Sequence, residues 1–429
     1  MNSRVMTLSM LFAMTAVACY AAKPGDNSWS QWRGPLRDGK STSTGLLQSW
    51  EDQQPQALWS LDGMGSGFAS VSIADGMLYT TGNFKDQGQG VVAINLKTKE
   101  VAWKQVLTDS IPQHGYKGSR CTPTIDGDRL YVVLSDGTVA CLSAKDGDVK
   151  WKHNFQEDWK GKKPNWGFAE SPLIDGDKLV CTPGAEGALI VALDKMTGKE
   201  IWATDATDAL GKKGKDDAGY SSIMISEGAG VRQYVQLVGK GVVGVDTETG
   251  KLLWNYNPVA NGTANIPTCI VDGDLVFAST GYGAGACLLK LSKDGTGVKA
   301  EEVYYLDGNV FQNHHGGMIQ LGDYIYAGTK HGKGIPICIE MKTGEIQWGG
   351  DIRGEGKGSA AVTYADGHLL FRYESGDIAL IEATPEEYRM KGKFMPEYQE
   401  QKSWAHPVVL DGLLYLREQN KLMVYDLRK

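Results

Sequence analysis

Short apolar runs separated by turn residues recur along most of this 429-residue chain. The runs are rich in Val, Ile, Leu and Tyr and are bounded by Gly and Asp, which is typical of β-strands. Within 125–133, Asp-Gly-Asp interrupts such a run and marks a hairpin, because Gly accepts the positive φ of a tight turn. No stretch after residue 22 shows the 3.6-residue apolar period of an amphipathic helix. The pattern therefore predicts an all-β fold.

A second phrase, built around Thr-Gly and followed by a strand that carries Trp, repeats at a regular distance. It is clearest at Ala192–Trp202, Val245–Trp254 and Ile339–Trp348. The repeat tryptophans from Trp59 to Trp254 are 44 to 52 residues apart, a period that suits one four-stranded propeller blade. Hairpins like the first one mark eight innermost strands, near residues 75, 126, 175, 227, 272, 321, 366 and 411. The sequence predicts an eight-bladed β-propeller of four-stranded blades.

The first strand and the last strands of the propeller segment, 56–429, are expected to form one blade together. The eighth unit runs from Leu410 to Leu427 and stops without a Trp-bearing strand. Ala57–Ser60 is such a strand, with no inner strands before it. An incomplete last sheet would expose an edge, so we expect residues 56–61 to form the outer strand of the last blade.

Residues 1–22 have the features of an export signal. Arg4 precedes an apolar run, and Ala16-Val17-Ala18 is a small-residue cleavage signature. Cys19 follows at once, so the segment also resembles a lipoprotein signal in which this Cys is acylated. Secretion and lipid anchoring both remain open. We expect an exported protein, periplasmic or associated with the outer membrane, without a transmembrane span.

The net charge and the positions of the cysteines restrict the possible partners and disulfide bonds of the protein. The net charge of −7 is spread along the chain, which argues against nucleic-acid binding. Cys141 and Cys338 stand where the repeat has Ala192, a small apolar position, and no Cys-x-x-Cys pair occurs. We therefore expect six reduced cysteines in the mature chain, although an even number in an exported protein would also suit disulfides. These are Cys121, Cys141, Cys181, Cys269, Cys287 and Cys338.

The Trp-bearing phrase resembles the tryptophan-docking motif of quinoprotein propellers, the family built on pyrroloquinoline-quinone (PQQ) repeats. The likeness covers residues 57–427 and implies that each Trp packs between neighbouring blades. The family includes PQQ-dependent alcohol or sugar dehydrogenases, and non-catalytic members such as the propeller lipoprotein of the outer-membrane assembly machinery. Segments 166–172, 313–317 and 403–407 are similar to a bacterial PQQ-like subfamily without an assigned activity.

A dehydrogenase of this family would need a specific cofactor site. The resemblance implies a quinone stacked on adjacent half-cystines, and Ca²⁺ held by a Glu, an Asn and an Asp. The chain has no adjacent cysteines, and Glu170 and Asn265 are only isolated candidates for the calcium ligands. PQQ and Ca²⁺ are therefore implied by resemblance alone, without matched ligands, and no catalytic residue is assigned.

The residues just before each innermost strand form the sharpest functional signal. In propellers these loops, with those between second and third strands, surround one mouth of the channel. We call this position of the repeat the slot. It holds a different polar or aromatic residue in each repeat, whereas the strand positions keep the same kinds of residue throughout. We expect a ligand to contact these mouth residues, which are Arg120, Glu170, Tyr220, Asn265, His314, His315, His331 and His406.

Each of these side chains also has a structural interpretation. One of His314 and His315 could form a hydrogen bond with backbone between blades while the other lines the channel. No metal site is assigned to them, because two neighbouring His on a strand would point to opposite faces of the sheet. Glu170 could be an acid or base, or could bond strand amides. Trp166 and Trp404 could stack on a ligand or pack between blades.

Two tryptophans lie close together near the start of the N-terminal arm, residues 23–55. Trp29 and Trp32 are expected to pack the arm onto the ring, with a partner-binding patch as the alternative.

The leading hypothesis from sequence is a binding or scaffolding protein of the cell envelope that uses its funnel mouth. Its partner would be a small molecule, a glycan or an envelope protein. The alternatives are a PQQ- and Ca²⁺-dependent dehydrogenase and a carbohydrate-binding protein without chemistry.

Overall fold

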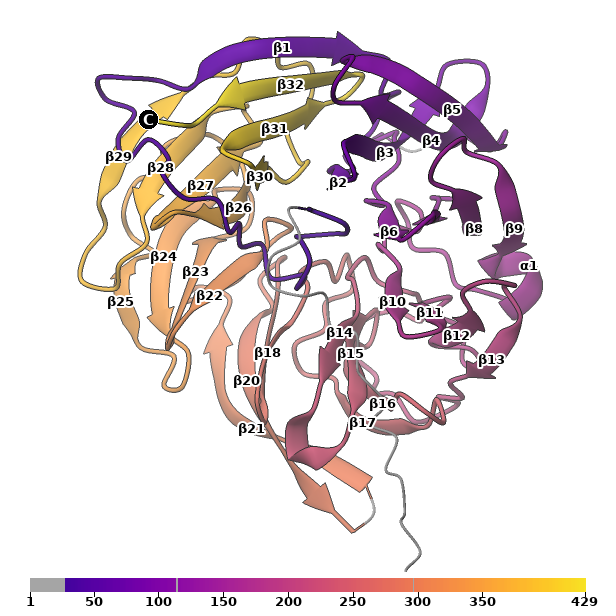
Figure 1. The fold of residues 1–429 in the computed structure, drawn as a ribbon. Coiled ribbons are helices and arrows are strands. Elements are labelled where there is room, and N and C mark those ends of the chain that lie inside the picture. Colours follow the sequence, from indigo (N-terminus) through magenta and orange to yellow (C-terminus); the bar gives the residue numbers. More distant parts are fainter. Residues whose placement is uncertain (1–27, 113–114, 296) are drawn as a thin grey trace, which may run out of the picture.

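Eight antiparallel sheets of four strands form a closed ring, as the repeat predicts (Figure 1). This computed structural model describes residues 28–112, 115–295 and 297–429. The expected export signal and Cys19 lie outside the described residues. Among the described residues, no helix is long and apolar enough to cross a membrane.

Blades 1 to 4 each consist of four consecutive strands. Blade 1 consists of β2 (Ser72–Ala74), β3 (Met77–Phe84), β4 (Gly88–Asn95) and β5 (Glu100–Thr108), and blade 2 of β6 (Thr124–Asp126), β7 (Arg129–Val133), β8 (Thr138–Ser143) and β9 (Val149–Asn154). Blade 3 consists of β10 (Leu173–Asp175), β11 (Lys178–Cys181), β12 (Val191–Asp194) and β13 (Glu200–Ala203), and blade 4 of β14 (Met224–Ser226), β15 (Gln233–Val238), β16 (Gly241–Asp246) and β17 (Leu252–Tyr256). A short helix, α1 (Phe155–Trp159), follows β9, and the 3-10 turn η1 (Gly228–Gly230) follows β14.

Blades 5 to 7 repeat this order, and blade 8 takes its outer strand from the N-terminal side. Blade 5 consists of β18 (Ile270–Asp272), β19 (Leu275–Thr280), β20 (Gly285–Asp294) and β21 (Gly297–Asp307), and blade 6 of β22 (Met318–Leu321), β23 (Tyr324–Thr329), β24 (Ile335–Glu340) and β25 (Ile346–Gly349). Blade 7 consists of β26 (Ala360–Ala365), β27 (His368–Tyr373), β28 (Ile378–Glu382) and β29 (Met390–Phe394), and blade 8 of β30 (Val408–Leu410), β31 (Leu413–Glu418), β32 (Lys421–Asp426) and β1 (Gln56–Asp62).

The ring closes as the sequence predicts, because β1 pairs with β32. Gln56 lies opposite Asp426 and Asp62 opposite Lys421 in an antiparallel register. Lys421 also forms an ion pair with Asp62, with Nζ and Oδ1 3.0 Å apart. The free edge of β32 is thereby covered.

The repeat tryptophans join neighbouring blades, as the resemblance implies. The indole N–H of Trp151 in blade 2 donates to the carbonyl oxygen of Lys195 in blade 3, over 2.9 Å. Gly198 of the Thr-Gly turn in blade 3 lies on the face of the same ring, where an added Cβ would be 2.7 Å from it. Gly198 also has a φ of +75°, so both the turn and the close approach require glycine.

Blade 5 makes the same junction without tryptophan. Gly344 faces the ring of Tyr304, whose hydroxyl donates to the carbonyl oxygen of Met341 over 2.6 Å. This substitution explains why the spacing from Trp254 to Trp348 covers two blades.

All six cysteines of the described chain are free and buried, which confirms the expectation of reduced thiols. In the strand register, Cys141 lies opposite Trp151 and Cys338 opposite Trp348, as Ala192 lies opposite Trp202. These two thiols therefore fill the small apolar position opposite Trp151 and Trp348.

The N-terminal arm, described from residue 28, runs across the channel (Figure 1). Trp29 is buried and pairs with Ile73 of blade 1. Further contacts join the arm to Ser171 beside blade 3, Met318 in blade 6, Tyr364 in blade 7 and Arg428 after blade 8. The arm thus joins blades that lie far apart around the ring.

Candidate functional site

A cavity of about 450 Å³ lies inside the mouth of the channel, above the arm. Its floor includes Trp32 and Arg33 of the arm, and its walls come from loops that precede the innermost strands of most blades. The volume falls in the range of small-molecule sites. The repeat therefore brings its variable loop positions together around one cavity.

Most of the predicted mouth residues meet in this cavity. Six of them line it together with both predicted stacking residues: Arg120, Tyr220, His314, His315, His331, His406, Trp166 and Trp404. They come from blades 2, 3, 4, 6 and 8, which the linear sequence separates widely. The slot before the innermost strand is thus a valid guide to the cavity wall.

Glu170 and Asn265 lie behind the wall rather than in the cavity. The Glu170 carboxylate accepts hydrogen bonds from the backbone N–H of Thr182 at 2.7 Å and from its hydroxyl at 2.9 Å. Burial raises the pKa of Glu170 to about 8, against the opposing hydrogen bonds from Thr182 and the charge of Arg37. Asn265 bonds to the loop backbone at Gly239, so its amide is also structural. For Glu170 the geometry matches the strand-amide interpretation.

Aromatic rings make up much of the cavity surface. The Trp404 ring lies 4.6 Å from Phe68 and 5.0 Å from Tyr116, measured between centroids, and Trp166 lies 6.0 Å from Tyr220. These side chains pack on one another and also face the cavity. The two interpretations of Trp166 and Trp404, packing and access to a ligand, are therefore compatible.

The histidines of blade 6 form a compact group. His314 and His315 lie in a loop, not on a strand, so the expected divergence to opposite faces is wrong and their ring centroids are 4.5 Å apart. The ring of His331 lies 4.1 Å from that of His314. Burial, with the neighbouring His315 and His331, lowers the pKa of His314 to about 2, which leaves its imidazole neutral.

Polar atoms without partners lie at the floor. His406 Nε2 bonds to the backbone carbonyl oxygen of His315 at 3.1 Å, so this nitrogen carries the proton. His406 Nδ1 then remains an acceptor and has no partner among the described residues. Arg33 Nε likewise lacks a partner there, although its Nη2 donates to Met318 and Asp38 carbonyl oxygens. Buried groups of this kind are costly unless a ligand or water satisfies them.

The cavity surface carries a positive charge. Its described lining residues include Arg33, Arg120 and Lys402 but no carboxylate, although Lys402 Nζ pairs with Glu374 Oε2, at 2.8 Å, beside the lining. Burial lowers the pKa of Arg33 and of Arg120 to about 10, so both remain protonated at neutral pH. Burial lowers the pKa of His406 to about 3, so it adds no charge. The site favours an anion.

Several residues of the site are missing from the sequence prediction. Glu374 accepts from Trp404 Nε1 at 3.0 Å and from Lys402 Nζ at 2.8 Å. These contacts and His315 hold the pKa of Glu374 below its usual range, although burial opposes them. Glu374 and Tyr282 follow the second strands of blades 7 and 5, as the predicted His331 does in blade 6. Comparing that loop across all repeats would have found both missing residues.

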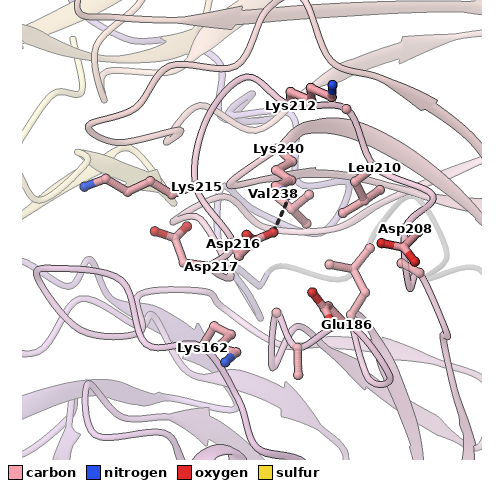
Figure 2. A pocket seen from close by; sticks show the side chains of 15 residues that line it. Lys162, Glu186, Asp208, Leu210, Lys212, Lys215, Asp216, Asp217, Val238 and Lys240 are labelled. Carbon is pink, nitrogen blue, oxygen red and sulfur yellow. Dashed lines mark ion pairs between the residues drawn. The ribbon is translucent and has the colours of Figure 1, made fainter.

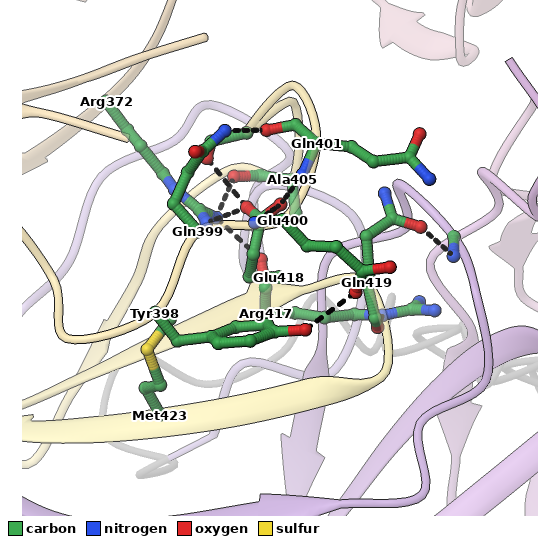
Figure 3. Close-up of polar contacts among 12 residues, drawn as sticks. Arg372, Tyr398, Gln399, Glu400, Gln401, Ala405, Arg417, Glu418, Gln419 and Met423 are labelled. Carbon is green, nitrogen blue, oxygen red and sulfur yellow. Dashed lines mark hydrogen bonds and ion pairs between the residues drawn. The ribbon is translucent and has the colours of Figure 1, made fainter. Parts of the chain in front are cut away.

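A buried ion pair anchors the loop that carries Lys402 and Trp404 (Figure 3). Arg372 Nη2 and Glu418 Oε2 are 2.9 Å apart, and each side chain is 1% exposed. Glu418 also accepts from the hydroxyl of Ser403 at 2.6 Å. Because an isolated buried charge is costly, this pair fixes the loop against blades 7 and 8.

A second hollow, of about 250 Å³, lies between blades 3 and 4 (Figure 2). It brings together two lysine-rich segments, 160–163 and 212–215, through Lys162, Lys212 and Lys215. The carboxylates around it balance the charge, and Lys240 Nζ pairs with Asp216 Oδ1 at 2.6 Å. These lysines therefore sit in a mixed-charge surface, unlike the cationic central cavity.

Comparison with known proteins agrees with the fold. A family model described as "Outer membrane protein assembly factor BamB", built on PQQ-like repeats, matches residues 13–160 and 119–350, well over half of the chain. The chain belongs to this PQQ-like propeller family.

Relatives of this PQQ-like propeller include both dehydrogenases and assembly factors. A polyvinylalcohol dehydrogenase of Sphingopyxis sp. is 30% identical over 154 residues, 32% of this chain and 22% of that protein. The BamB of Shewanella oneidensis is 23% identical over 285 residues, 64% of this chain and 65% of that protein. The chain thus spans about a fifth of the first relative's length and just under two thirds of the second's.

The solved structure of quinohemoprotein alcohol dehydrogenase from Comamonas testosteroni superposes with a TM-score of 0.64 at 13% identity. The match covers 94% of this chain and 81% of that one. At this identity the likeness concerns the fold alone.

The residues of this PQQ-like propeller do not fit a calcium-bound quinone. Glu170 and Asn265 are engaged behind the wall, and the described lining residues offer no carboxylate. Calcium requires several converging oxygen ligands. The described cysteines are buried and unpaired, so they provide no adjacent half-cystines for stacking.

Proposed function

We propose that this propeller is a cell-envelope binding protein whose central cavity holds a small, ring-bearing organic anion. The observation that carries the proposal is the composition of the cavity. Seven aromatic side chains and three cations line it, with no carboxylate among the described lining residues: Trp32, Phe68, Tyr116, Trp166, Tyr220, Tyr282 and Trp404, with Arg33, Arg120 and Lys402.

The aromatic walls favour a ring over a linear acid. Trp404 and Trp166 belong to different blades and both face the cavity, so a flat or cyclic ligand can contact indole surface. A carboxylate on that ring would meet the cationic side chains.

The envelope location rests on the expected export signal and on relatives named as outer-membrane assembly factors. Scaffolding through the same face is compatible with ligand binding, because the mouth opens outward from the ring. Sugar acids and aromatic acids, including PQQ as a ring-bearing acid without calcium, belong to the proposed ligand class.

Calorimetry on the full-length mature protein tests the proposal, in buffer that contains a metal chelator. The probes are ring-bearing acids paired with neutral analogues, such as glucuronate with glucose and benzoate with benzyl alcohol, and PQQ with and without added Ca²⁺. We expect at least one acid to bind about tenfold or more tightly than its neutral partner. Equal affinities throughout, or no binding by any acid, would contradict the proposal.

Two variants locate the binding. Trp166→Ala and Lys402→Gln should each weaken the acid about tenfold, because one removes ring surface and the other a positive charge. Trp159→Ala is the matched control, since Trp159 lies in α1 and bonds to Glu200 away from the cavity. A loss of affinity in Trp159→Ala as large as in Trp166→Ala would place the ligand elsewhere.

A further inference from the structure

Three side chains beside the cavity are arranged like the ligands of a metal ion. One donor atom each from His314, His315 and Glu374 lies within 4.8 Å of the other two. His315 Nε2 is 3.2 Å from Glu374 Oε1. The two imidazoles come from the loop before β22 and the carboxylate from the loop after β27, so adjacent blades 6 and 7 build the group together.

Outer contacts hold two of these groups in place. His314 Nδ1 lies 2.8 Å from the hydroxyl oxygen of Ser359 and its Nε2 lies 3.1 Å from that of Tyr282. Glu374 is held by Trp404 and Lys402. Metal-binding imidazoles and carboxylates usually have such second partners, which fix the orientation of the ligand atom.

We propose that His314, His315 and Glu374 bind a divalent transition-metal ion of the Zn²⁺ class. Two imidazole nitrogens and one carboxylate form a recognised set for such ions, whereas calcium prefers oxygen ligands alone. The three residues take up three positions. Because His314 and His315 line the cavity, the remaining positions face it and are open to an oxygen atom of a ligand.

His331 is a neighbour of this site rather than a fourth ligand. Its Nδ1 accepts from the backbone N–H of Tyr282 at 3.4 Å, and its ring packs beside His314. The metal site goes beyond the proposed anion binding and does not depend on it. Each can hold while the other fails, because the metal is tested without any organic acid.

A zinc titration of the full-length, chelator-treated protein tests this inference. We expect one Zn²⁺ per chain, measured by competition with a chromophoric chelator. His315→Ala and Glu374→Gln should each weaken Zn²⁺ by about 100-fold or more, since even outer-partner changes cost 10- to 100-fold. Glu374→Gln keeps an oxygen acceptor for Trp404, so its fold should be retained.

His153→Ala is the matched control. His153 also pairs with a carboxylate, with Nδ1 and Asp158 Oδ2 3.2 Å apart, but it lies beside α1 on the outside of blade 2. Its Zn²⁺ affinity should equal that of the unaltered protein. The inference fails if the unaltered protein binds no Zn²⁺, if Glu374→Gln binds it equally well, or if His153→Ala loses as much. Circular dichroism of each variant checks the fold, and Glu374→Gln decides if His315→Ala is misfolded.

Discussion

Trp32 of the N-terminal arm packs edge-on against His406 of blade 8, with ring centroids 4.6 Å apart and an interplanar angle of 62°. The arm therefore does more than cover the ring, since Trp32 also lines the cavity. Its indole N–H donates to the hydroxyl of Thr268 beside blade 5, over 3.2 Å. The segment that precedes the propeller thus supplies part of the candidate binding surface.

Replacing Trp29 and Trp32 of the arm should separate stability from binding. Trp32→Ala removes cavity surface and should weaken a bound acid about tenfold. Trp29 is buried away from the cavity, so Trp29→Ala should lower the free energy of unfolding by about 3–5 kcal/mol. Calorimetry and urea unfolding measure the two effects. Equal affinity for the acid in Trp32→Ala and the unaltered protein would remove Trp32 from the site.

The close contact between Gly198 and the Trp151 ring predicts that even a change of this glycine to alanine lowers the free energy of unfolding markedly. Gly198→Ala places a Cβ 2.7 Å from the indole ring, whereas a Cβ at Gly176 in the same blade meets nothing within 4 Å. Both glycines have positive φ, +75° and +59°, so Gly176→Ala controls for backbone strain. We expect Gly198→Ala to cost about 1–3 kcal/mol more in urea unfolding. Equal costs would show that the close approach does not constrain residue 198.

Ring closure by β1 can be tested with two deletions. Removing residues 23–62 takes away the arm and β1, which leaves the edge of β32 exposed. Removing residues 23–55 takes the arm but keeps β1. The longer deletion should abolish the single sharp unfolding transition, and the shorter one should only lower its midpoint. A single sharp transition in the longer deletion would refute closure as a requirement for cooperative folding.

Buried Glu170 predicts a specific dependence of stability on pH. Its folded pKa of about 8 exceeds its ordinary value of 4.5, so folding takes up a proton between these values. The stability contributed by the neutral carboxyl is present below the ordinary value and is lost as pH rises toward 8. Glu170→Gln is neutral throughout. Its stability relative to the unaltered protein should rise by up to about 1.4 kcal/mol per pH unit across this window.

Urea unfolding of both proteins at several pH values measures this difference. The histidines, which lose protons on folding, are shared by both proteins and cancel. A difference that stays constant with pH would mean that Glu170 is ionised in the folded state.

The fold could be predicted because its signals are local and repeated. Thr-Gly turns and the tryptophans that pack on them recur at blade spacing, and the missing outer strand of blade 8 pointed to β1. Blade 5 is marked by its hairpin near residue 272 and by the spacing, since Tyr304 replaces the tryptophan. Such a replacement preserves the packing surface and the hydrogen bond while removing the sequence signal.

The site could be predicted only in part, because the slot fixes where a residue stands in the blade but not the direction in which its side chain points. Asn265 and Glu170 occupy the slot, yet they satisfy backbone groups behind the wall. Glu374 and Trp32 lie outside the slot, in a different loop and in the arm, and still reach the cavity region. Side-chain direction depends on neighbours from other blades, which the repeat alone does not specify.

The most direct test of the central claim is a crystal structure of the full-length protein purified from its natural source. The account predicts density for a ring-bearing acid between Trp166 and Trp404, with its carboxylate near Arg33, Arg120 or Lys402. Ordered water alone throughout the cavity, in protein that was never exposed to denaturant, would contradict it.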